Sequence, residues 1–161
     1  MWDVKKASKL GMIVALLCTQ AISEAPLVTV ALESATVKPG GTADVKLSLT
    51  IPSGVEAAGL NWTLRYPATV IEDIVVRAES AANAAQKSLK CRSVSGEMKC
   101  VLFGLNTNAL ASGTLATVTF RVRKDVAESS VDIRVTDLVV ASPSGSSVPC
   151  SGSNGSLSVR K

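Results

Sequence analysis

The chain has 161 residues, a formal net charge of +4 and no histidine. Hydrophobic residues make up 47% of it and aromatic residues only 3%, so the core of one domain must be built mostly from aliphatic side chains. Without histidine, and with its only paired carboxylates at Glu72 and Asp73, which point to opposite faces of a strand, the chain is expected to be no enzyme and to bind no metal or cofactor.

The first 25 residues predict an export signal. Three lysines precede an apolar run at 10–18 that is too short to span a bilayer, and Ala21 and Ala25 offer small residues before a cut. A retained hydrophobic helix is the alternative, and Cys18 leaves lipidation open. We therefore expect a bacterial protein that is secreted, extracellular or periplasmic, and that meets a membrane only through this segment. Because the leader carries three of the cations, charge favours no nucleic-acid partner.

Residues 26–161 predict one folded unit of about nine short strands, with turn residues between them. A loop or brief helix is expected at 78–86, and a flexible loop at 142–154, which is rich in Ser, Gly and Pro. This spacing is typical of an all-β, antiparallel sandwich of the jelly-roll type. The expected strands are 27–32, 43–51, 59–66, 70–77, the two arms of a hairpin at 88–104, 113–123 with one slip in its alternation, 131–141 and 156–159.

The strand 60–66 alternates apolar and polar residues, which predicts one face in the core and one in water. The core side chains are expected to be Leu60, Trp62, Leu64 and Tyr66. The solvent-facing side chains are expected to be Asn61, Thr63 and Arg65.

In the hairpin, a two-residue turn at Ser95 and Gly96 places Cys91 opposite Cys100 at a non-hydrogen-bonded pair, where side chains are closest. In an exported protein this favours a disulfide, and two reduced, buried thiols are the alternative. Cys150 is left over, either as a free thiol or as a link to another chain.

Four segments, in this order, resemble cohesin modules, which are structural relatives of carbohydrate-binding modules. They are the turn and strand 38–45, the run R-Y-P-A-T-V-I-E at 65–72, the apolar strand 101–106 and the strand G-T-L-A-T-V-T-F at 113–120. The second departs from the family pattern, since an aspartate is lost and the proline comes one place early. The resemblance implies a β-sandwich that holds dockerin modules on bacterial surfaces or in cellulosomes.

In the family the dockerin lies across the sheet face of strands three, five, six and eight, and an acidic residue on strand three commonly contacts it. The matching residue here is Asn61. We expect the partner surface to comprise Asn61, Thr63 and Arg65, continued by a basic strip of Lys90, Arg92 and Lys99 that prefers an acidic partner. Ordinary solubilising charges are the plain alternative.

Two other functions stay open at this point. A carbohydrate-binding module with a polysaccharide partner would need exposed aromatic rings, above all Trp62. A structural subunit of a surface, pilus or virion assembly would be favoured by a Cys150 link between chains.

Overall fold

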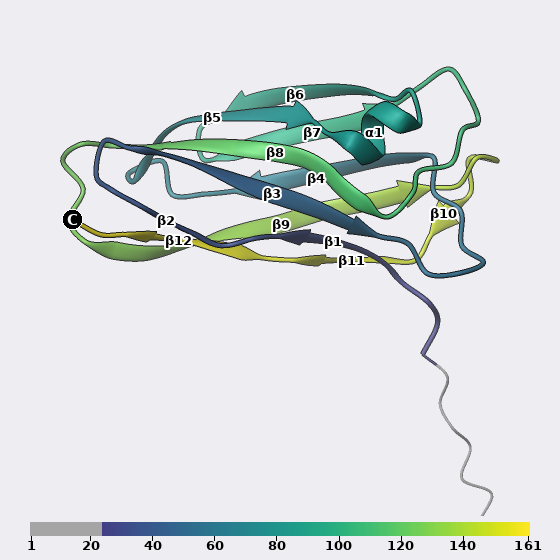
Figure 1. Ribbon diagram of the computed structural model, residues 1–161, viewed down its shortest axis with the longest axis horizontal. Coiled ribbons are helices and arrows are strands. Elements are labelled where there is room, and N and C mark those ends of the chain that lie inside the picture. Colours follow the sequence, from purple (N-terminus) through teal and green to yellow (C-terminus); the bar gives the residue numbers. More distant parts are fainter. Residues whose placement is uncertain (1–23) are drawn as a thin grey trace, which may run out of the picture.

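The computed structural model describes residues 24–161, which form a sandwich of two β-sheets (Figure 1). The export signal expected at 1–25, with Cys18, lies outside the described residues apart from its last two. Within the described part of the chain, no helix is both long and apolar enough to cross a membrane.

The first sheet has five strands and the second has six in its main path. In spatial order the first sheet is β11 (Cys150–Ser153), β1 (Val28–Leu32), β3 (Thr42–Thr50), β8 (Gly113–Val122) and β5 (Ile71–Ala78). The second sheet is β2 (Ala35–Val37), β12 (Gly155–Val159), β9 (Ser129–Ala141), β4 (Gly59–Arg65), β7 (Glu97–Phe103) and β6 (Ser88–Val94), with β10 (Ser147–Val148) pairing with β9. The single helix of the described residues is α1 (Ser80–Ala84), within the segment predicted as a loop or brief helix.

The predicted all-β sandwich is confirmed, and each expected strand is present within one or two residues of its bounds. The slip predicted in 113–123 is a bulge at Leu115, since Leu47 pairs with Ala116 while Ser48 pairs with Thr114. Alternating apolar residues with β-branched neighbours explain why these runs form strands.

The prediction of a flexible loop at 142–154 is wrong, because β10 and β11 lie there. Serine and glycine have low strand propensity, but here contacts with neighbouring strands outweigh it. Gly152 lies so close to β9 that an added Cβ would be 3.1 Å from the Val135 carbonyl oxygen. The Val135 backbone N–H also donates to Asn154 Oδ1 (2.9 Å), which fixes the end of β11.

The expectation of a wholly antiparallel arrangement is also wrong at the chain ends. β1 pairs in parallel with β11, and β2 pairs in parallel with β12. Both ends of the domain switch from one sheet to the other at neighbouring points, so the two terminal segments run side by side in each sheet. At this switch Gly155 leaves no room for a side chain, since a Cβ would meet the Glu33 carbonyl oxygen.

The core between the sheets is mostly aliphatic, as composition requires. Leu60, Trp62 and Leu64 are buried as predicted, with Trp62 only 1% exposed. Tyr66, directly after β4, is half-buried against the core, and its hydroxyl shares a hydrogen bond with Ser93 (3.2 Å). The alternation of this strand therefore assigns its inner face correctly.

Thr63 corrects the prediction for the other face of β4. It lies on the outer side of the sheet, as its parity requires, but it is only 3% exposed. Its strand has neighbours on both sides, with Lys99 of β7 and Thr136 of β9 directly opposite. A short side chain between two flanking strands is readily covered, and Lys99 has a long aliphatic stem that can lie over it. Asn61 and Arg65 are exposed as predicted.

Candidate functional site: the outer face of the second sheet

The structure brings all six residues of the predicted partner surface onto one face, which we call the outer face and define as the solvent side of β9, β4, β7 and β6. Strand register sets their positions. Thr63 lies opposite Lys99, which in turn lies opposite Arg92. In the next row, Asn61 and Lys90 lie on either side of Val101. Arg65 lies opposite Glu97 one row away in the other direction.

The hairpin that carries half of these residues has the predicted register. Val94 pairs with Glu97, and a disulfide joins Cys91 to Cys100 with a Cα–Cα distance of 4.1 Å. The turn requires Gly96 for two reasons: its φ is +79°, and an added Cβ would be 3.1 Å from the Tyr66 carbonyl oxygen. Because the cysteines have the opposite parity to Lys90, Arg92 and Lys99, the basic side chains project outward while the disulfide lies on the inner side.

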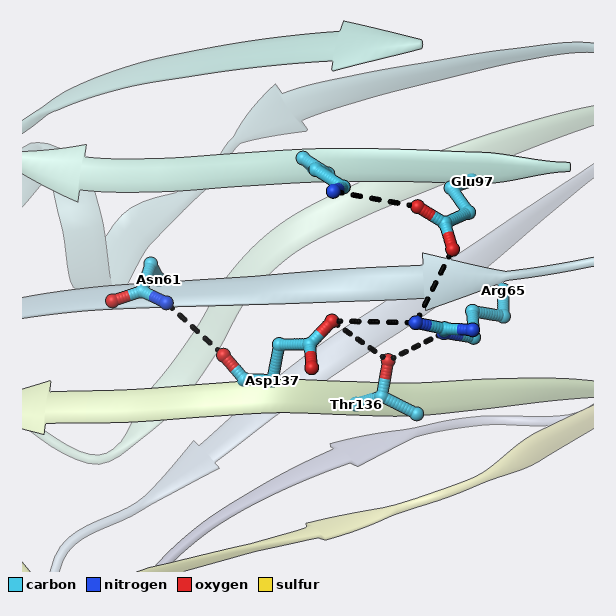
Figure 2. A network of polar contacts seen from close by, with 6 residues as sticks. Asn61, Arg65, Glu97, Thr136 and Asp137 are labelled. Atoms are coloured by element: carbon cyan, nitrogen blue, oxygen red, sulfur yellow. Dashed lines mark hydrogen bonds and ion pairs between the residues drawn. The ribbon is translucent and has the colours of Figure 1, made fainter. Parts of the chain in front are cut away.

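Arg65 is the centre of a polar network that sequence analysis missed (Figure 2). Its Nη2 lies 3.2 Å from Glu97 Oε1 and 3.8 Å from Asp137 Oδ2, and its Nε donates to Thr136 Oγ1 (3.2 Å). The second oxygen of Glu97 lies 3.5 Å from Lys99 Nζ. The charge of Arg65 is therefore already opposed by two carboxylates of its own chain.

A bulge in β9 places Asp137 in this network. Asn61 pairs with Val139 and Thr63 with Thr136, so β9 has one extra residue here, and Asp137 adopts a left-handed φ of +51°. Asn61 Nδ2 donates to the Asp137 carbonyl oxygen (3.0 Å), which stabilises the bulge. The sequence did contain a signal for this bulge. The inward positions of the strand are odd-numbered at Ile133 and Val135 but even-numbered at Val140.

Lys90 and Arg92 form a basic corner at the edge of the outer face. Both are exposed on the edge strand β6, and among residues 24–161 neither makes an ion pair. With Lys99 they border a shallow hollow that has Thr63 and Val101 in its lining. Cations without carboxylate partners leave this corner free to meet an acidic group.

The end of the outer face farthest from Arg65 is apolar. Val101 and Phe103 of β7 and Val139 of β9 are exposed, and Phe103 keeps 43% of its surface accessible. Gly59 of β4 and Ala141 of β9 pair with each other in this region. Because both residues are small, a shallow groove remains there. The outer face thus has the Arg65 network at one end, apolar side chains at the other end, and the basic corner at its edge beside the rows between them.

Other sequence candidates lie away from this face or are buried. Trp62 cannot stack on a sugar, since it is buried, and its indole N–H has no hydrogen-bond partner in the structure. Cys150 is half-buried in β11, with Sγ 3.5 Å from the Leu138 carbonyl oxygen. Within the described residues no group of three acidic or cysteine side chains is placed to hold a metal ion.

Comparisons with known proteins agree with this architecture. The model of the cohesin domain family matches residues 28–159. No curated protein matches the chain.

Solved structures with the same fold include three cohesins. The sixth cohesin of scaffoldin B from Acetivibrio cellulolyticus, in complex with a mutant Cel5 dockerin, is 17% identical with a TM-score of 0.72, over 83% of this chain and 99% of that one. The cohesin of a type I cohesin–dockerin complex from Clostridium thermocellum is 14% identical with a TM-score of 0.74, over 83% and 99%. A non-cellulosomal cohesin from Archaeoglobus fulgidus is 18% identical with a TM-score of 0.67, over 84% and 92%. Because the family model covers most of the chain and the fold agrees, the chain belongs to the cohesin domain family.

Proposed function

We propose that this chain is a non-catalytic protein-binding module that takes part in extracellular assembly, and that its partner is a dockerin-type module. The observation that carries the proposal is the outer face, where four adjacent strands present an ordered polar network at one end, apolar side chains at the other end and two unpaired cations on the edge strand beside the rows between them. Cohesins of the same fold were solved in complex with dockerins. The disulfide is consistent with an oxidising compartment, as the proposed secretion requires.

The six candidate residues have different roles in this proposal. Lys90 and Arg92 are the cations that meet the partner, since nothing in the described chain neutralises them. Arg65 and Lys99 share Glu97, and Arg65 also faces Asp137, so these two order the polar end of the face. Asn61 holds the β9 bulge, and Asn61 and Thr63 both line the shallow hollow beside the basic corner. A partner with acidic side chains complements this arrangement.

The carbohydrate-binding alternative has little support from the geometry. Sugar recognition by stacking needs exposed planar rings, and in the described chain Trp62 and Phe120 are buried while Tyr66 is half-buried. Phe103 alone among these aromatics is well exposed. The half-buried Cys150 likewise offers no special support for a structural subunit linked by disulfides.

Binding of purified chain to the dockerins of the two cohesin–dockerin complexes described above tests the proposal. Affinity and association rate are measured at low and high salt for the wild type, Arg92→Glu and Arg121→Glu. Arg121 is the matched control because it is exposed on β8, on the solvent side of the other sheet. Arg92→Glu should slow association markedly at low salt while Arg121→Glu does not. Equal effects of the two variants would place the partner surface elsewhere.

A further inference from the structure

Leu105 is the most exposed large apolar side chain of the described residues, with a relative accessibility of 108%. It lies two residues beyond Phe103, in the loop from β7 to β8 that projects from one end of the sandwich (Figure 1). A single exposed leucine on a surface is ordinary. This one follows directly after β7, whose last residue, Phe103, belongs with Val101 and Val139 to the apolar end of the outer face.

The loop around Leu105 is held in place by a buried lysine. Lys87 is only 6% exposed, and its Nζ donates to the backbone oxygen of Asn106 (3.0 Å) and to Asn106 Oδ1 (2.8 Å). Its aliphatic stem passes under Gly104, where an added Cβ would be 3.0 Å from Lys87 Cδ. No carboxylate of the described chain pairs with this amine. Burying a lysine amine without a carboxylate partner costs free energy, which indicates that the chain requires its contact with Asn106.

Asparagine side chains complete the attachment on both sides. Asn106 Nδ2 donates to the Gln86 carbonyl oxygen (3.1 Å), and the Asn108 backbone N–H donates to Asn106 Oδ1 (3.1 Å). Asn108 Nδ2 donates to the Ala85 carbonyl oxygen (3.3 Å). Further along, the Leu110 N–H donates to the Ala57 carbonyl oxygen (2.7 Å) and the Leu110 side chain is buried. Leu105 is thus an exposed apolar side chain on a loop tied down at both ends.

We infer that Leu105 is a preorganised anchor that inserts into an apolar hollow of the partner protein, and that Lys87 is the positioning residue that keeps the loop in its binding shape. This rests on the proposed function and extends its surface beyond the strands. We expect carboxylates beside this hollow, because the loop of Leu105 follows β7, which pairs with the edge strand β6 that carries the unpaired cations Lys90 and Arg92. An anchor that is ordered before binding loses little conformational entropy when it binds.

The first test needs no partner. Backbone order parameters at residues 104–108 are measured by NMR relaxation in the wild type and in Lys87→Met, which keeps the apolar stem and removes the amine. We expect values near about 0.85 in the wild type and a fall toward about 0.6 in the variant, with the strands unchanged. Values below about 0.6 in the wild-type loop would overturn the inference.

The second test uses a naive library of linear peptides displayed on phage and selected on the wild-type chain, since such selections favour binding hot spots. The selected peptides are expected to combine acidic and apolar residues. Their affinity should fall roughly tenfold or more for Leu105→Ser, and less for Lys87→Met, with no change for Val75→Ser. Val75 is the control because it is exposed on β5 of the other sheet.

The two proposals fail in different ways. If Arg92→Glu lowers the affinity of the peptides and Leu105→Ser does not, the anchor is overturned and the outer face is supported. If Leu105→Ser lowers the affinity of the peptides and Arg92→Glu does not, the anchor is supported and the basic corner is not part of the partner surface. Peptides insensitive to both would overturn the anchor and count against the proposed face. Melting curves of Leu105→Ser should match the wild type, because the side chain makes no core contact.

Discussion

Replacing Trp62 by alanine is expected to cost a large part of the stability of this domain. Trp62 is the largest of the fully buried side chains, and it lies directly opposite Cys100, whose sulfur is in the disulfide. Truncating a buried tryptophan to alanine costs about 3–5 kcal/mol, because apolar contact is lost and a cavity remains.

The unpartnered indole N–H refines this magnitude. A buried donor without an acceptor costs about 1–3 kcal/mol in the folded state, and both alanine and phenylalanine remove it. We therefore expect Trp62→Ala to cost roughly 3 kcal/mol, at the lower end of the usual range. Trp62→Phe keeps most of the ring volume and should cost under about 1.5 kcal/mol.

Urea denaturation followed by far-ultraviolet circular dichroism measures both values without relying on the tryptophan signal. The alanine variant should also melt about 10 °C lower. A cost under about 1 kcal/mol for Trp62→Ala would refute the burial of the ring. If Trp62→Phe costs as much as Trp62→Ala, the indole N–H has a partner and the reasoning about its desolvation is wrong.

Three further changes test other parts of the molecule. Reducing the Cys91–Cys100 disulfide, whose cysteines are 9 residues apart, should lower the free energy of unfolding by roughly 2–3 kcal/mol, as read from urea midpoints with and without reductant; identical midpoints would contradict its stabilising role. Gly155→Ala should cost about 1–3 kcal/mol or prevent folding, because the added Cβ meets the Glu33 carbonyl oxygen, and a wild-type melting curve would show that the sheet switch can relax. Arg65→Ala should change stability by under about 1 kcal/mol, since its two ion pairs are solvent-exposed; a larger loss in thermal melts would show that the network is structural.

Local pattern was enough for the parts of the fold that depend on period and turn geometry. Because side chains alternate strictly along a strand, the run 60–66 by itself assigns Trp62 and Leu64 to the core and Arg65 to the surface. A two-residue turn fixes the pairing of a hairpin, so Ser95 and Gly96 determine that Cys91 faces Cys100. The shared parity of the basic strip follows from the same register.

Contacts between segments far apart in the chain decided the rest. β11 forms from residues of weak strand preference because β1 lies beside it, more than a hundred residues away in the sequence. Thr63 is buried although its face is outward, because neighbours on two strands cover it. The Arg65 network also depends on tertiary contacts, because it needs the β9 bulge. The position of Leu105 depends on Lys87, which holds its loop. Alternation predicts which side of a strand a residue occupies, but which residues become its neighbours depends on the tertiary fold.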